Sequence, residues 1–213
     1  MKNLYLFSGL GADHRMFQFL EFQEYNTIFI NWTIPEKNET IENYARRLIT
    51  QIRTPKPILI GLSFGGIIAI EVAKIIETEK LILIASAKNK NELPMYCRIA
   101  GYLQLHKFLP LAFLKVSNFF TNWLFGAKTE FDKKLLKDIL RDTDLKFLKW
   151  AINQIFSWKN TASHQNLIHI HGTADRILPI FFSNPDIKVN GGGHFMTINK
   201  ADELNEIIRK LLK

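Results

Sequence analysis

The stretch PILIGLSFGGIIAI, from Pro57 to Ile70, constrains the fold of this chain more than any other part of its sequence. Its beginning, as far as Ile60, is a short apolar run of the kind that forms a buried strand. Its end, from Ile67 onward, has the composition of a helix that packs against that strand. Ser63 lies on the turn between the two, among glycines. The stretch therefore predicts a strand, a tight turn and a helix in direct succession.

Strand-like runs alternate with helix-like segments along most of the chain. We expect strands at residues 4–7, 27–31, 58–60, 81–85, 167–171 and 187–189. We expect helices near residues 15–22, 41–52, 64–76 and 201–212. Thr40, with acidic residues on either side, is a start signal for the second of these helices. Strands that alternate with helices favour an α/β fold, in which a mostly parallel central sheet carries helices on both faces.

The alternation breaks at residues 88–160, which contain helix-like stretches such as 98–120 and 144–158 but no obvious strand. This segment holds 13 Lys or Arg against 6 Asp or Glu, so it accounts for +7 of the net charge of +8. Its many aromatic residues are mixed with Leu and Ile at helical spacing, which is typical of a packed apolar face rather than of a surface that stacks nucleic-acid bases. We expect residues 1–87 and 161–213 to form the core, and residues 88–160 to be a helical insertion between two of its strands.

The composition is that of one substantial globular domain. The chain has 213 residues, of which 47% are hydrophobic and 23% are charged. Its first residues lead straight into an expected strand, so we expect no signal peptide, and the apolar run that ends before Glu71 is too short for a bilayer span. A single cysteine, Cys97, excludes an internal disulfide and fits a reducing compartment. We therefore expect a cytoplasmic location, with Cys97 as a small core residue rather than a reactive thiol.

The turn that holds Ser63 has the pattern of a nucleophile. Residues 61–65, GLSFG, match G-x-S-x-G. A serine that stands out on a sharp turn takes a strained backbone conformation, and side chains two residues to either side would collide. Glycine at positions 61 and 65 removes those collisions, and we expect Gly66 to let the helix pack closely on the sheet. The N-terminus of that helix would also offer free N–H groups to a developing oxyanion.

A serine nucleophile needs a base, and the base needs an acid that orients it. His194 lies in VNGGGHFMTI, on a glycine-rich loop after an expected strand. Asp175 lies four residues beyond the end of another expected strand, in LIHIHGTADRILPI. The chain order Ser63, Asp175, His194 is the order expected for groups on successive loops at one edge of a sheet. Asp186 is the alternative acid, but it precedes its strand and should lie at the opposite edge.

These residues resemble the α/β-hydrolase superfamily. GLSFGG is similar to its nucleophile elbow, HGTADRILP to its acid loop and GGGHF to its histidine loop. The early LFSGLGADHRMF resembles the loop after the first core strand, which completes the oxyanion hole. The resemblance covers the whole chain, and it implies an α/β-hydrolase fold in which residues 88–160 are the helical cap. One departure is Ser8, where many members carry histidine in a His-Gly pair.

The resemblance also implies a function. Ser63, Asp175 and His194 would form a catalytic triad, and the backbone N–H groups of Phe64 and Leu10 would form the oxyanion hole. A chain of this kind would be a serine hydrolase that cleaves a small carboxylic ester with an apolar acyl group through an acyl-enzyme, without a metal or organic cofactor. Three alternatives stay open: a thioesterase acting on an acyl carrier or on coenzyme A, a cofactor-free lyase, and a ligand-binding protein that has lost turnover. The positive charge of residues 88–160 would attract an acidic substrate or carrier.

Other polar side chains of the sequence fit structural roles better than metal, catalytic or nucleotide sites. His169 and His171 share a face of one expected strand, but the absence of a third ligand at zinc-like spacing favours a structural role. Asp13 and His14 fit a helix cap better than a second catalytic pair. The chain has no phosphate-binding loop of the G-x-x-x-x-G-K kind, and GGGH lacks the strand-to-helix setting of a dinucleotide site. We therefore expect no metal, no nucleotide cofactor and no nucleic-acid partner.

Overall fold

The central sheet of the protein is all parallel, in a computed structural model that describes residues 2–102, 115, 117–162 and 164–213. Its strands run in the order β2-β1-β3-β4-β5-β6. They are β1 (Lys2–Phe7), β2 (Tyr25–Phe29), β3 (Ile58–Leu62), β4 (Lys80–Ile84), β5 (Leu167–Gly172) and β6 (Ile187–Val189). The predicted α/β architecture with a parallel sheet is confirmed.

The strand order reverses between β1 and β3. The chain steps outward from β1 to β2, crosses back to β3 on the other side of β1, and then continues in sequence to β6. In open parallel sheets, ligands bind beyond the carboxyl ends of the strands at such a reversal. The loop that follows β1 and the turn that follows β3, which holds Ser63, therefore lie where a ligand site is expected.

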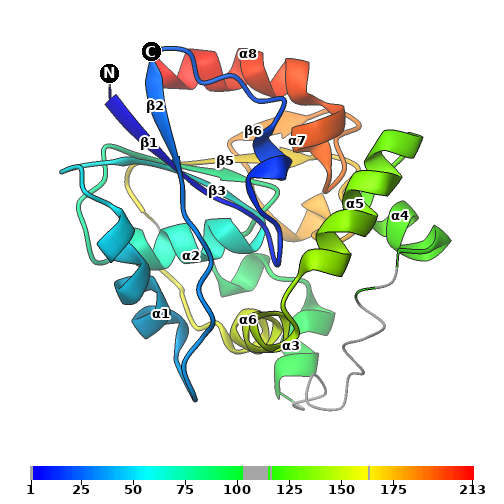
Figure 1. The fold of residues 1–213 in the computed structure, drawn as a ribbon, viewed down its shortest axis with the longest axis horizontal. Helices are drawn as coiled ribbons and strands as arrows, with labels where there is room; N and C mark the ends of the chain where they lie inside the picture. The colour runs from blue at the N-terminus through cyan, green and yellow to red at the C-terminus, as the bar shows by residue number, and fades with distance from the viewer. Residues whose placement is uncertain (1, 103–114, 116, 163) are drawn as a thin grey trace.

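Helices cover both faces of the sheet (Figure 1). One layer contains α1 (Ile41–Leu48) and α2 (Phe64–Ala73), which pack on Tyr5, Phe7 and alternate residues of the inner strands. The other layer contains α7 (Met196–Asn199) and α8 (Ala201–Leu212), which pack on the intervening strand residues. Because both faces are buried, the inner strands are continuous apolar runs rather than alternating ones.

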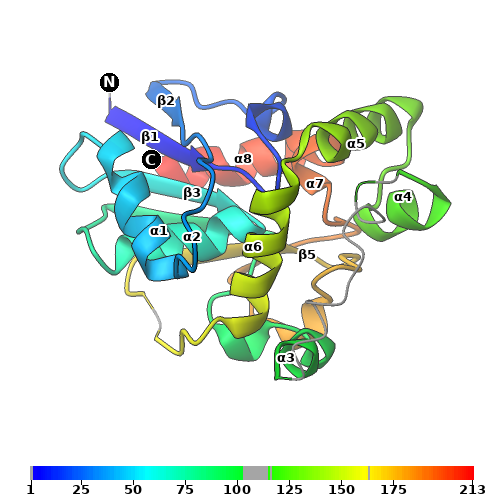
Figure 2. The same cartoon turned by 60° about the horizontal axis from the view of Figure 1, so that its bottom comes forward.

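The segment between β4 and β5 is helical where the structure describes it. Its helices are α3 (Met95–Tyr102), α4 (Phe119–Phe125), α5 (Glu130–Asp142) and α6 (Leu145–Ser157). Figure 2 shows them at the same end of the sheet, away from the N-terminus of β1. Part of the expected helical stretch 98–120 lies outside the described residues. The division of the chain into a core and a cap at residues 88–160 stays a prediction.

Side-chain caps explain where three of these helices begin. Asn118 and Thr129 each form a reciprocal capping box with the residue three positions later, and Asp144 accepts from the backbone N–H of Phe147.

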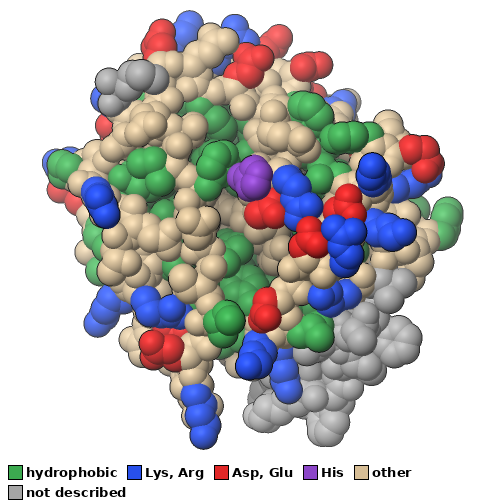
Figure 3. Space-filling view, viewed as in Figure 1, with side chains coloured by type: hydrophobic (Ala, Val, Ile, Leu, Met, Phe, Trp, Pro, Cys, Tyr) green, Lys and Arg blue, Asp and Glu red, His purple; other side chains and the backbone are tan. Residues whose placement is uncertain are grey.

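The surface over α5 mixes basic and acidic side chains (Figure 3). None of the helices in the described ranges is both long enough and apolar enough to cross a membrane.

Most expected elements are found, with differences at their ends. Thr40 caps α1 by accepting from the N–H of Asn43, and a 3-10 turn, Ile49–Gln51, extends that helix. Strand β2 lies two residues earlier than expected. The expected helix at 15–22 is wrong: a single 3-10 turn, His14–Phe17, stands there, followed by an irregular segment. Met16, Phe17 and Leu20 are buried in the core although they lie in the 3-10 turn and the irregular segment after it. Their spacing along the sequence would fit a short helix equally well. Two further 3-10 turns are Lys90–Glu92 and Ile180–Phe182.

Candidate active site

Ser63 occupies the sharp turn between β3 and α2. Its backbone has φ 53° and ψ −121°, a strained conformation for a residue with a side chain. Three hydrogen bonds hold it there. Its N–H donates to the carbonyl of Ile84 at 2.9 Å, and its carbonyl accepts from the N–H of Gly66 at 2.9 Å and from the Ser86 hydroxyl at 2.7 Å. The turn is therefore clamped by both the helix and the loop after β4.

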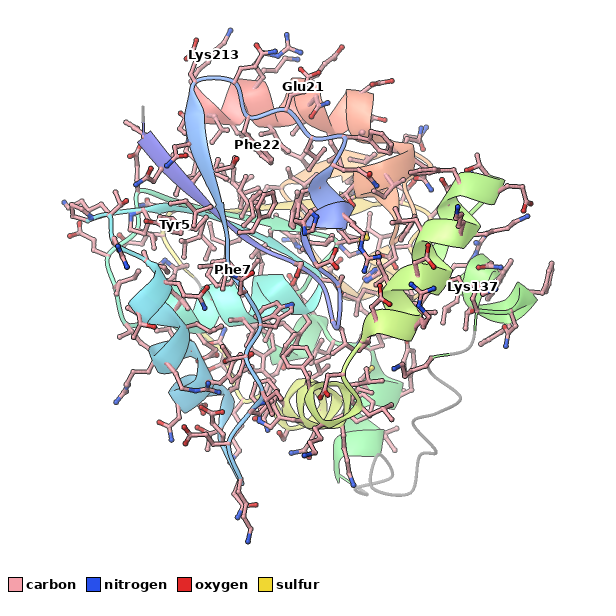
Figure 4. All side chains as sticks on the ribbon, viewed as in Figure 1. Tyr5, Phe7, Glu21, Phe22, Lys137 and Lys213 are labelled. Carbon is pink, nitrogen blue, oxygen red and sulfur yellow. The ribbon has the colours of Figure 1, made fainter. Side chains whose placement is uncertain are left out.

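Close backbone approach explains the two glycines that flank the serine. A Cβ at position 61 would overlap the backbone of Gly65 and Gly66. A Cβ at position 65 would overlap the carbonyl groups of Phe7 and Ser8 at the end of β1, whose Tyr5 and Phe7 are labelled in Figure 4. A Cβ at position 66 would overlap the Ser86 side chain and lie 3.2 Å from the carbonyl oxygen of Gly61 in β3, which agrees with the close packing of α2 on the sheet expected for Gly66. A larger residue at position 65 would push the turn away from β1, and one at position 61 would push the start of α2 away from β3.

His194 lies on the loop between β6 and α7 and joins the two other predicted residues. Its Nε2 lies 2.9 Å from the hydroxyl oxygen of Ser63, and its Nδ1 lies 2.8 Å from Oδ2 of Asp175. A carboxylate can only accept, so Nδ1 carries the proton and Nε2 is free to accept from the serine hydroxyl. The structure thus brings Ser63, His194 and Asp175 together from loops after three different strands.

Asp175 is buried, and both oxygens of its carboxylate accept hydrogen bonds. Oδ1 accepts from the backbone N–H groups of Ile177 and Leu178, each at 2.9 Å, and Oδ2 accepts from His194. Burial acts to raise the pKa of this carboxyl. The charge and hydrogen bond of His194 and the N–H of Leu178 outweigh burial and hold the pKa below its ordinary value of 3.8. Asp175 is therefore ionised at neutral pH and able to stabilise a positive charge on His194.

The alternative acid lies elsewhere. Asp186 precedes β6, where its Oδ2 accepts from the backbone N–H of His169 at 2.8 Å and faces the ammonium of Lys88 at 3.5 Å. Asp13 caps the 3-10 turn that follows the first loop, by accepting from the N–H of Arg15. Asp186 thus holds the middle of β5, and Asp13 acts as the helix cap that its sequence position suggested.

The loop after β1, residues 8–12, lies beside the serine. A Cβ on Gly9 would stand 3.6 Å from the Cβ of Ser63. The loop is closed by bonds to the carbonyl of Ala12, which accepts from the Ser8 hydroxyl at 2.6 Å and from Nε1 of Trp32 at 3.1 Å. The hydroxyl of Ser8, the position that departs from the family pattern, thus forms a hydrogen bond within the loop. We call residues 8–12 the oxyanion loop, after the role predicted for Leu10.

The predicted oxyanion donors occupy suitable segments. Phe64 is the first residue of α2, and the first N–H groups of a helix have no partner within the helix. Leu10 lies in the middle of the oxyanion loop, next to Gly9. That these two N–H groups receive an oxyanion stays a prediction.

Several contacts at the site were not anticipated from the sequence. Ser86 directly follows β4, and a small polar residue after a strand that neighbours β3 was the only signal for it. The end of α4 contacts the histidine loop: the Phe125 carbonyl accepts from the N–H of Phe195 at 3.1 Å, and the ring of Phe125 meets His194 edge-on. On the other side, the hydroxyl of Thr143 lies 3.0 Å from the carbonyl oxygen of Gly11 and 2.8 Å from that of Ile139, and its proton is shared between the two. The helical segment therefore touches both sides of the serine.

The remaining candidates contribute no metal site within the described residues, where no group of three or more His, Cys, Asp or Glu side chains could hold an ion. His169 and His171 instead bond to each other, with 3.1 Å between their nearest ring nitrogens. Cys97 is half-buried, and burial raises the pKa of its thiol to about 11. It is therefore a neutral thiol at physiological pH, as a packing residue would be.

Comparisons with known proteins bear on the fold. The sequence patterns of known families and the curated proteins give no match. Solved structures do match. The bromoperoxidase of Bacillus anthracis has a TM-score of 0.71 at 19% identity, covering 99% of this chain and 91% of that one. A thermophilic esterase of Thermogutta terrifontis has a TM-score of 0.69 at 17% identity, covering 100% and 89%. An esterase of Exiguobacterium antarcticum has a TM-score of 0.70 at 15% identity, covering 100% and 92%.

These structures share one architecture, and the match extends over nearly the whole of each chain. Identities below 20% limit the likeness to the fold. The parallel sheet, the strand order and the strained serine turn agree with that likeness, and from them we conclude that this chain has the α/β-hydrolase fold.

Proposed function

We propose that this protein is a serine hydrolase that cleaves carboxylic esters with an apolar acyl group. One observation carries the proposal: Asp175, His194 and Ser63 form an unbroken hydrogen-bond chain with distances of 2.8 and 2.9 Å. The chain ends on a serine that the backbone holds in a strained turn at the start of a helix. A serine with only a structural role in such a turn would need neither an oriented imidazole nor a buried carboxylate behind it.

The geometry supports a two-step reaction. Ser63 attacks the carbonyl carbon while His194 takes the hydroxyl proton, and His194 then gives that proton to the leaving alcohol. Asp175 keeps the imidazole proton on Nδ1 and stabilises the imidazolium that forms. A water that His194 deprotonates then attacks the acyl-enzyme and regenerates the serine. This sequence of steps uses no metal and no organic cofactor.

Backbone N–H groups supply the stabilisation of the oxyanion in this proposal. Phe64 contributes one donor from the start of α2, and Leu10 contributes the other from the oxyanion loop. Loss of one such donor costs about 2.7–4 kcal/mol of barrier in serine hydrolases of this kind. The arrangement is consistent with the position of Gly9, where an added Cβ would lie 3.6 Å from the Cβ of Ser63, so the loop passes close to the serine.

The surroundings of the serine favour an apolar acyl group. Phe125 faces His194, and Phe64 lies in an aromatic cluster with Trp32, Phe147 and Trp150, with ring centroids about 6 Å apart. Phe64 and Phe147 are buried in the core, so the apolar surface offered to a substrate comes from partly exposed rings such as Phe125 and Trp32. Two of the solved structures named above are esterases, which agrees with an ester substrate.

A thioesterase that acts on an acidic acyl carrier is the second candidate. The observation in its favour is the net charge of +7 on residues 88–160. Helix α5 contributes nothing to this net charge, because its four Lys or Arg side chains are matched by four Asp or Glu, with Lys133 paired to Glu130 and Arg141 to Asp138. The ester hydrolase is therefore the better supported of the two, and a binding protein without turnover is the outcome to exclude.

The test is hydrolysis of p-nitrophenyl esters from acetate to laurate by the wild type and by Ser63→Ala. We expect turnover with an optimum of chain length in the wild type, and a fall in kcat on the order of 10⁶-fold in the variant. A fluorophosphonate probe should label the wild type and not Ser63→Ala. Turnover in a folded Ser63→Ala variant would refute the nucleophile. A wild type that neither turns over esters nor reacts with the probe would indicate a binding protein.

A further inference from the structure

Two histidines lie beneath the acid loop and have no part in the reaction described above. His169 and His171 are on β5, and both side chains are fully buried. Nδ1 of His171 lies 3.1 Å from Nε2 of His169, and Nε2 of His171 lies 2.7 Å from the carbonyl oxygen of Leu178. Buried imidazoles cost free energy unless their nitrogens are bonded, so the partners of each nitrogen indicate its role.

The partners determine where the protons are. A carbonyl oxygen only accepts, so Nε2 of His171 carries a proton and donates to Leu178. In a neutral ring, Nδ1 of His171 is then an acceptor, so Nε2 of His169 must donate to it. The hydrogen bonds run in one direction, from His169 to His171 to the Leu178 carbonyl. Burial lowers the pKa of His169 to about 3 and also lowers the pKa of His171, so both rings are neutral at physiological pH.

Leu178 connects this pair to the catalytic acid. Its N–H donates to Oδ1 of Asp175 at 2.9 Å, while its carbonyl accepts from His171. The same residue is therefore held at both ends, once by the carboxylate and once by the buried ring. With Leu178 and Ile177 bonded to Oδ1, the other oxygen, Oδ2, is directed to His194. Loss of the His171 bond would free the end of the acid loop.

The charge of His171 matters as well as its hydrogen bond. Its Nε2 lies 3.8 Å from Oδ2 of Asp175, too far for a hydrogen bond but close enough for a strong ionic attraction. An imidazolium at position 171 would compete with His194 for the negative charge of Asp175. A neutral ring leaves that charge to His194.

Other charged groups face the pair from neighbouring elements. Glu92, from the 3-10 turn after β4, places Oε2 3.7 Å from Nδ1 of His169. This nitrogen is buried, and among the described residues its nearest backbone partner, Ser86, forms no hydrogen bond of good geometry with it. Lys88 acts against a positive charge on His169, and Asp186 bonds the backbone N–H of that residue. His194 and Asp175 complete the set around His171.

We propose that His171 is a positioning residue for the catalytic acid: as a neutral ring it donates to Leu178, holds the Asp175 loop, and has its tautomer set by His169. The proposal rests on the function proposed above, in which Asp175 orients His194. Second-layer partners of this kind change activity by about 10- to 100-fold when they are removed.

The test compares His171→Leu with His171→Gln. The leucine removes the donor, whereas the glutamine amide can still reach the Leu178 carbonyl but cannot become charged. We expect His171→Leu to lower kcat for p-nitrophenyl esters by about 10-fold or more with little change in KM, and to move the acid limb of kcat/KM to lower pH, because a looser Asp175 stabilises the imidazolium less. His171→Gln should keep the wild-type acid limb and most of the activity.

A matched control is His164→Leu, since His164 also bonds a backbone carbonyl, that of Ala73, away from the triad. It should lower the melting temperature without moving the acid limb. If His171→Leu does not fold, His171→Asn replaces it, because its shorter amide cannot reach Leu178. Equal pH profiles for the wild type and for His171→Leu or His171→Asn, or the same loss in His171→Gln as in those variants, would overturn the proposal.

A second readout does not depend on turnover. Ring ¹⁵N shifts of the labelled protein should show His171 protonated at Nε2, and amide hydrogen exchange at Leu178 should become faster in His171→Leu but not in His171→Gln or His164→Leu. The opposite tautomer, or unchanged exchange at Leu178, would overturn the proposal. If these expectations are met and the wild type nevertheless fails to hydrolyse esters, the fault lies in the proposed function and the support of the acid loop stands.

Discussion

The two sides of Ser63 are held in place in different ways. On the acid–base side, the loops of Asp175 and His194 are tied to each other and to the sheet: Ala174 N–H donates to the Gly192 carbonyl at 2.9 Å, and His171 on β5 supports the acid loop. On the other side, the oxyanion loop contacts the junction between α5 and α6, where the Thr143 hydroxyl lies within hydrogen-bond distance of the Gly11 carbonyl. The acid–base geometry thus depends mainly on the core, and the oxyanion loop depends on the helical segment.

This difference has a consequence for how each side should respond to substitution. The acid–base side contains buried titratable groups, so changes there should alter both rate and pH dependence. Residues 8–12 contain no titratable side chain, so changes at the α5–α6 junction should alter the rate alone. The end of α4 also reaches the acid–base side, through a hydrogen bond to the backbone of Phe195 and through the ring of Phe125, which meets His194 edge-on.

Among substitutions that compare the two sides of Ser63, the largest effect is expected from Asp175→Asn, which removes the charge on the acid–base side. The amide would place an NH₂ group against Nδ1 of His194 or lose that bond, and the imidazole would favour the tautomer with its proton on Nε2. That tautomer cannot accept from Ser63, so kcat should fall by about 10⁴-fold. Asp186→Asn is the matched control and should stay within a few-fold of the wild type. The reverse ranking, measured with p-nitrophenyl esters, would show that Asp186 is the acid.

The second prediction concerns stability on the acid–base side. The pKa of His169 is lowered to about 3 in the folded state from an ordinary value of 6.5. As the pH falls below 6.5, the unfolded chain takes up a proton that the folded protein does not, so the free energy of unfolding decreases, and the decrease ends near pH 3. The loss has a limiting slope of about 1.4 kcal/mol per pH unit.

Urea unfolding at pH 7 and pH 5 tests this expectation. His169→Gln, whose amide can still donate to His171, should lose about 2 kcal/mol less than the wild type between these pH values. Thr143→Val, on the other side of the serine, should keep the wild-type dependence. Equal pH dependence in the wild type and His169→Gln would mean that His169 takes up a proton as readily in the folded protein as in the unfolded chain.

The third prediction addresses the oxyanion side. Thr143→Val keeps the shape of the side chain against Gly11 but removes its hydroxyl. The oxyanion loop should loosen, and kcat should fall by about 10-fold, a fraction of the 10²- to 10³-fold that the loss of a whole oxyanion donor costs. KM and the acid limb should not change. Thr143→Ser keeps the hydroxyl and should behave as the wild type. A shift of the acid limb in Thr143→Val would show that the two sides are not independent.

The two sides also differ in how far the sequence predicts them. The sequence predicts the turn at Ser63 because the strand, the glycines and the helix are contiguous, and it predicts Asp175 and His194 because each lies in the loop after a strand. Thr143 and Gly11 are 132 positions apart, and neither residue type marks a contact of this kind. The support of Asp175 by His171 needed the structure as well, since the spacing of His169 and His171 shows a shared face but not what that face meets.

Helix ends gave a similar lesson. Thr129 and Asp132 form the capping box of α5, and the pattern T-x-x-D is a start signal for this helix within the segment predicted to be helical. At residues 15–22, apolar residues predicted a helix, but Met16 and Phe17 are buried from a 3-10 turn. Local spacing cannot distinguish these cases when the segment is short and its environment in the core decides the conformation.

The smallest expected effect concerns the charge of residues 88–160. If this charge steers an acidic carrier, kcat/KM for a carrier-bound thioester should fall by about threefold when the salt concentration rises from about 0.02 to 0.15 M, because screening shortens the range of the field. The effect is small because pairs such as Lys133 with Glu130 already neutralise part of α5. A neutral short ester should change little. If both substrates lose rate equally, salt acts on the site itself, for example through the pair of Arg15 with Asp142 beside the oxyanion loop, and steering is rejected.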